Sequence, residues 1–118
     1  MGITTVRVRG LYELGSGSVL CSNAESPLVE ASGGVPHKLS GYVDLSKLAP
    51  GGSVVVALYV KVRPGGAWQQ YHQETYTAPL PSPVVFIEGR PDTYGLKVTV
   101  RTVAGPDVDV DYEFFSEM

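Results

Sequence analysis

The sequence predicts an all-β protein, an antiparallel β-sandwich with about eight strands. Apolar and polar residues alternate over many short stretches, the period of a strand with one buried face. The 118 residues include 14 glycines and 9 prolines, so turn signals recur along the whole chain. No apolar pattern of helical period persists beyond a turn, so no long helix is expected. These observations favour a jelly-roll or immunoglobulin-like sandwich in a single domain, residues 1–118.

The first third predicts short strands separated by flexible chain. Residues 3–9 alternate β-branched and polar side chains, which indicates a first strand. Residues 11–14 continue it after a bend or bulge, and residues 15–18, Gly-Ser-Gly-Ser, are expected to form a flexible turn. Residues 19–21 form a short strand. Residues 22–36, rich in Ser, Gly and Pro, predict a long loop that is either mobile or in contact with a partner.

The middle of the chain contains the strongest strand pattern. Residues 38–43 predict a strand, followed at residues 44–48 by a single helical turn that Asp44 caps and from which Leu45 and Leu48 face inward. In residues 53–63 apolar side chains occupy one face, and Val55, Ala57 and Tyr59 occupy the other. This pattern predicts a central strand, covered on both sides for part of its length.

The next segments predict a hairpin and a crossing. Residues 63–66, Arg-Pro-Gly-Gly, form a hairpin turn, from which residues 67–77 return as a polar, aromatic strand. Three prolines in residues 78–83 exclude a helix or a central strand, so this segment is a stiff crossing between two sheets. Residues 84–88 predict a short strand, and residues 89–92 a turn.

The C-terminal stretch shows the clearest alternation. Residues 94–103 and 108–115 each place apolar side chains on one face and charged ones on the other, and residues 104–107, Ala-Gly-Pro-Asp, form a turn. This pattern predicts a β-hairpin at the edge of a larger sheet system. The predicted core comprises Val54, Val56, Leu58, Val60, Leu96, Val98, Val100, Val110 and Tyr112.

Composition limits the classes of partner and the compartment. A formal charge of −3 argues against strong binding to nucleic acid or to an anionic membrane. Cys21 has no second cysteine with which to form a disulfide, and it is expected to be a small buried residue. We expect no signal peptide and no membrane-spanning segment. The predicted location is a virion surface if the protein is viral, and otherwise the cytoplasm.

The residues that could carry out chemistry do not form a catalytic or metal motif. Cys21, His37 and His72 lack the spacing of zinc ligands or of a nucleophile and its base. We therefore expect no enzymatic activity, no cofactor and no metal site.

An acidic row is expected along the last strand, where Asp107, Asp109, Asp111 and Glu113 share one face. Ion pairs with Lys97 and Arg101 on the neighbouring strand, together with protection of a sheet edge, explain the row. Calcium binding is an alternative, although a flat strand does not converge oxygen ligands.

The candidate interface or ligand residues are Trp68, Tyr71, His72 and Tyr76, set among amides and a carboxylate. Alternation places Trp68, His72 and Tyr76 on one face of their strand and Tyr71 on the other. Three interpretations are open: packing in the core, a protein interface, in which Trp and Tyr are enriched, or a sugar-binding surface.

Several turn and strand patterns resemble a family of small β-domains. Residues 44–52, 54–61, 84–85 and 97–99, together with Trp68, Glu74, Thr75, Tyr76, Ala104, Gly105, Tyr112 and Glu113, resemble head-associated proteins of tailed viruses and virus-like elements. The resemblance covers residues 44–114 and leaves the first third unmatched. It implies a β-sandwich without catalytic residues that decorates or stabilises a capsid, commonly as a trimer, by contact with the major capsid protein.

The expected function is therefore that of a non-enzymatic structural protein, a virion decoration or capsid-stabilising subunit. The alternative is a carbohydrate-binding module that uses surface aromatics. Residues 3–14 and 67–77 carry apolar or aromatic side chains on both faces, which predicts a homo-oligomer. The trimer is favoured because of the family resemblance.

Overall fold

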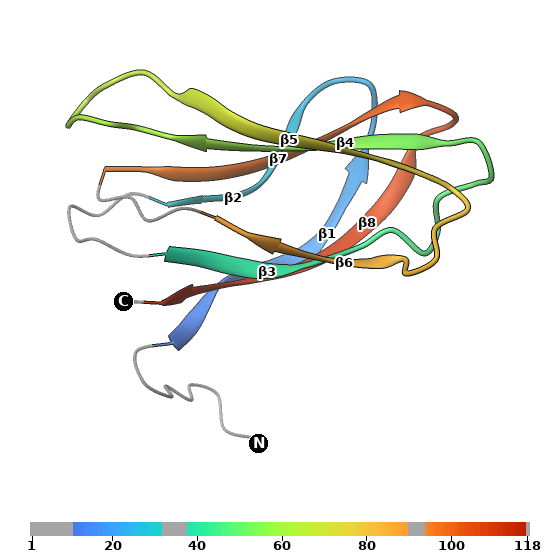
Figure 1. Cartoon of the computed structure of the whole chain (residues 1–118), viewed down its shortest axis with the longest axis horizontal. Coiled ribbons are helices and arrows are strands. Elements are labelled where there is room, and N and C mark those ends of the chain that lie inside the picture. The colour runs from blue at the N-terminus through green and yellow to red at the C-terminus, as the bar shows by residue number, and fades with distance from the viewer. Residues whose placement is uncertain (1–10, 32–37, 90–93, 118) are drawn as a thin grey trace.

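The computed structural model describes residues 11–31, 38–89 and 94–117, and side chains from residue 14 to residue 116 within these ranges. In this part of the chain, eight strands form two four-stranded sheets, packed as the upper and lower layers of Figure 1. The strands are β1 (Leu11–Cys21), β2 (Ser26–Ala31), β3 (Lys38–Asp44), β4 (Ser53–Val60), β5 (Gln69–Thr77), β6 (Val84–Glu88), β7 (Leu96–Ala104) and β8 (Val108–Glu117). The predicted all-β sandwich is confirmed.

The sheet order places sequence neighbours in opposite layers, except β4 and β5, which pair with each other in one sheet. The lower sheet has the order β1-β8-β3-β6, the upper sheet has the order β2-β7-β4-β5, and every ladder is antiparallel. The predicted hairpin of residues 94–103 and 108–115 is therefore wrong. Strands β7 and β8 lie in different sheets, and both are interior strands. Alternation shows that a strand has one buried face, but it does not distinguish a partner in the same sheet from one in the opposite sheet.

Two further predictions in the first third are corrected. Residues 15–18 do not form a turn, because β1 continues through them and pairs with β8, with a register shift between Glu13 and Gly15. Part of the predicted loop at residues 22–36 is β2, which pairs with β7 and buries Leu28 and Val29. Both segments have a weak local preference for strand, so the sequence did not predict them as strands. Hydrogen bonds to a long neighbouring strand stabilise them in that conformation. The predicted strand at residues 3–9 lies outside the described residues.

The core lies between the two sheets and follows the predicted alternation. Most of the predicted core residues are buried, and Val60 and Tyr112 are partly buried. Leu45 and Leu48 also face inward, from a turn in which the Leu48 amide donates to the Leu45 carbonyl and the Ser46 amide donates to Asp44. The crossing from β5 to β6 passes from the upper to the lower sheet, as the three prolines predicted.

Cys21 is fully buried at the end of β1. Burial, with a smaller contribution from the charge of Asp107, raises the pKa of its thiol to about 11. The thiol therefore stays protonated at neutral pH, as expected for a small core residue. Among the described residues, no helix is long and apolar enough to cross a membrane.

Candidate functional site

A groove lies between β5 and β6, the strands that end the upper and lower sheets on the same side of the sandwich. We call it the β5–β6 groove. Its volume is about 200 Å³, and it is lined by Val56, Leu58, His72, Glu74, Tyr76, Phe86, Ile87 and Glu88. The groove exists because the two sheets, which contact each other between β1 and β2, are open at this opposite edge.

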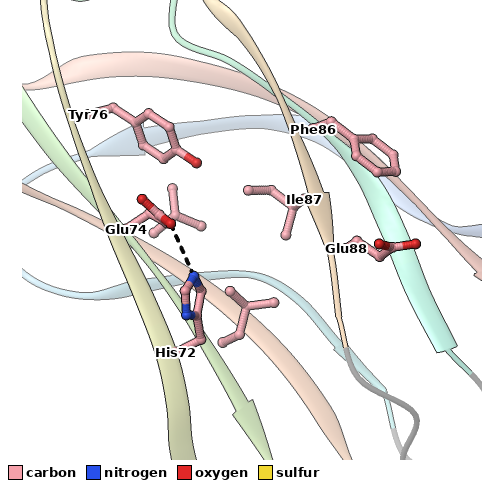
Figure 2. Close-up of a pocket in the computed structure, with 8 residues that line it drawn as sticks. His72, Glu74, Tyr76, Phe86, Ile87 and Glu88 are labelled. Carbon is pink, nitrogen blue, oxygen red and sulfur yellow. Dashed lines mark ion pairs between the residues drawn. The ribbon is translucent and has the colours of Figure 1, made fainter.

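The groove combines an apolar floor with polar side chains from one strand. Val56 and Leu58 of β4 are buried, and Ile87 of β6 points from the other sheet into the same space (Figure 2). On β5, His72 pairs with Leu58 and Glu74 pairs with Val56, so both polar residues face the interior side of the sheet. This arrangement can bind an extended segment that presents apolar and polar side chains in alternation.

The polar side chains of the groove interact with one another. His72 Nε2 lies 3.3 Å from Glu74 Oε1, as the dashed line in Figure 2 shows. The Tyr76 ring lies beside His72 and Glu74 on β5. Burial and the charge of Glu74 raise the pKa of the Tyr76 hydroxyl. On β6, Phe86 and Glu88 border the groove, but their side chains point to the outer side of the lower sheet, where Glu88 forms an ion pair with Lys38 at 2.8 Å.

The four predicted site residues are divided between the two faces of the upper sheet, and the division differs from the one that the sequence predicted. His72 and Tyr76 share the interior face, but Trp68 lies over Lys61 and Lys97 on the outer face of the upper sheet. Tyr71, placed on the other face by alternation, packs against the core, and its hydroxyl approaches Gly89. A register shift in the β4–β5 ladder between Leu58 and Tyr59 causes the difference, because a bulge reverses the alternation beyond it.

Trp68 is held by the chain's own cations. Lys61 Nζ lies 4.6 Å and Lys97 Nζ 4.8 Å from the centre of its ring, and Lys97 also lies 4.6 Å from the ring of Tyr59. The indole also contacts Gly95, where an added Cβ would lie 2.9 Å from it. A sugar that stacked on Trp68 would compete with these lysines, so Trp68 is a weaker ligand candidate than Tyr76.

A second polar cluster lies on the same outer face. The hydroxyls of Tyr59 and Thr99 both donate to Glu25 Oε2 at 2.5 Å. These hydrogen bonds, with smaller contributions from Lys97 and Arg101, lower the pKa of the Glu25 carboxyl. The sequence did not predict this cluster because its members come from three separate parts of the chain.

The Glu25 cluster predicts a pH-dependent contribution to stability. Because the folded-state pKa of Glu25 is lowered, its contribution is present above the unfolded pKa, about 4.5, and is lost as the pH falls through the folded value. We expect Glu25→Gln to reduce the free energy of unfolding by less than about 1 kcal/mol at pH 7, since the carboxyl is exposed. At pH 3 the difference from the wild type should be smaller.

Urea unfolding of both proteins at pH 7 and pH 3 checks this prediction. Glu30→Gln controls for the removal of a negative charge, because it alters an exposed carboxyl of β2. A difference between wild type and Glu25→Gln that is equal at the two pH values would contradict the expected linkage.

The acidic row is present, but its predicted partners are not beside it. Asp109, Asp111 and Glu113 point outward from β8, and Asp111 accepts a hydrogen bond from the Ser18 hydroxyl. Lys97 and Arg101 lie on the outer face of the other sheet, so the predicted cross-strand ion pairs are wrong. Among the described residues, no three His, Cys, Asp or Glu side chains are grouped so that they could hold a metal ion.

Comparisons with protein-family models, with curated proteins and with solved structures find no match to this chain.

Proposed function

We propose that this chain is a structural protein that acts through protein–protein contacts, as a virion decoration or capsid-stabilising subunit. The observation that carries the proposal is the β5–β6 groove, an apolar floor between two edge strands. Edge strands present backbone donors and acceptors to an added strand, and the alternating lining provides sites for its side chains. The major capsid protein is the partner that the family resemblance suggests, and a trimer is the assembly.

The test is binding to shells assembled from the major capsid protein encoded in the same genome, measured by co-sedimentation. We expect the wild type to bind and Glu74→Arg to bind at least about tenfold more weakly, because a longer cationic side chain would occupy the groove. Gln73→Arg is the matched control, since it introduces the same side chain on the opposite face of β5. It should bind like the wild type.

Failure of the wild type to bind the shells would overturn the capsid assignment. Equal loss in Glu74→Arg and Gln73→Arg would overturn the role of the groove. The second candidate function is carbohydrate binding, favoured by the position of Tyr76 beside Glu74 and His72. Glycan binding that is lost in Tyr76→Ala but kept in Trp68→Ala would establish this alternative.

A further inference from the structure

The two outer surfaces of the sandwich carry opposite charge. In the lower sheet of Figure 1, the described side chains that point away from the core include several carboxylates and one ammonium group. We call this outer surface the acidic face. Its members are Asp44, Glu88, Asp109, Asp111, Glu113 and Lys38. On the upper sheet, the outward positions form what we call the basic face, with Lys61, Lys97, Arg101, Glu25 and Glu30. Negative charge exceeds positive charge on the first face, and the reverse holds on the second.

The acidic face also exposes apolar side chains. Tyr42 and Phe86 lie opposite each other on β3 and β6, with ring centres 5.4 Å apart, and they are 48% and 54% exposed. Val84, two residues before Phe86 on β6, is exposed beside them, whereas Leu20 is exposed on β1, at the opposite edge of the sheet. Grouped apolar side chains of this kind, bordered by charges, mark surfaces that are covered in an assembly.

We infer that the acidic face of one copy of this chain binds the basic face of a second copy. Charge decides between the ways in which two copies can meet: two acidic faces or two basic faces would repel, whereas unlike faces attract. Aromatic side chains lie on both surfaces, with Tyr42 and Phe86 on one and Tyr59 and Trp68 on the other. The contact therefore combines apolar burial with opposite charge.

Such a contact is heterologous, because each copy uses two different surfaces. Heterologous contacts close into a ring when the rotation between subunits permits, and otherwise they form an open series. Because the two faces lie on opposite sides of the sandwich, such contacts stack copies in an open series, so this inference goes beyond the proposed function and names a contact other than that of the proposed trimer. It does not depend on the β5–β6 groove, so it can fail while capsid binding succeeds.

The test is sedimentation of the whole chain at increasing concentration in low and high salt. We expect association in low salt that weakens in high salt, because screening reduces the attraction between charged faces. Glu113→Lys on the acidic face and Arg101→Glu on the basic face should each weaken association by about tenfold or more.

The matched control variants make the same kinds of charge reversal at positions outside the two faces. Asp107→Lys lies in the connection between β7 and β8, and Lys47→Glu lies in the turn after β3; both sites are exposed. We expect these controls to associate like the wild type, and circular dichroism verifies that each variant is folded. A wild type that stays at 12.6 kDa at all concentrations would overturn the inference. So would single variants that associate normally.

Discussion

Phe114→Ala is expected to reduce the free energy of unfolding by about 3–5 kcal/mol, the usual cost of deleting a buried aromatic ring. Phe114 is fully buried in β8, an interior strand of the lower sheet, and it is the largest side chain among the most deeply buried residues. Its ring packs 6.1 Å from that of Tyr112, measured between ring centres. Truncation would leave a cavity that neighbouring strands cannot fill without breaking their hydrogen-bonded ladders.

Phe115→Ala is the matched control, because it removes the same side chain from the next residue of the same strand. Phe115 points to the outer face and is only partly buried. Chemical unfolding of the two variants should therefore show a much smaller loss for Phe115→Ala. Equal losses would mean that the assignment of inner and outer faces on β8 is wrong.

Gly41→Ala is expected to reduce the free energy of unfolding by about 3 kcal/mol, at the upper end of the cost of overpacking a core. Gly41 lies in β3 between β8 and β6, opposite Phe114 and Ile87. An added Cβ would lie 2.5 Å from Phe114 Cδ1 and 2.7 Å from Phe114 Cα, and it would also collide with the carbonyl oxygen of Glu113. Backbone atoms cannot rotate away, so the two strands would have to separate.

Gly15→Ala provides the control for this prediction. A Cβ at Gly15 would meet its nearest neighbour, Val29 Cγ2, at 3.7 Å, which is ordinary contact. Because glycine in a strand is less favourable than alanine, this change should be neutral or stabilising by about 0.5 kcal/mol. Thermal unfolding of both variants checks the contrast, and a Gly41→Ala protein as stable as the wild type would contradict the packing described for β3.

The alternation of side chains was enough to predict the fold class and most of the core. Val54, Val56, Leu58, Leu96, Val98, Val100 and Val110 are buried as their period-2 positions indicated. The prolines of residues 78–83 predicted a crossing between sheets, because they remove backbone donors from any central ladder. These inferences depend only on local chemistry, which is why the sequence by itself determined them.

The partners of each strand were decided by the tertiary structure. Strands β7 and β8 have the pattern of a hairpin, but each pairs with strands distant in sequence, so Asp111 lies beside Ser18 and not beside Lys97. The register shift between Leu58 and Tyr59 places Trp68 and His72 on opposite faces of the sheet, although alternation had predicted that they share a face. Pairing depends on hydrogen bonds and packing between distant segments, and a shift of one residue in register reverses every face beyond it. The tertiary structure alone therefore determined which side chains form the β5–β6 groove and how charge divides between the two outer faces.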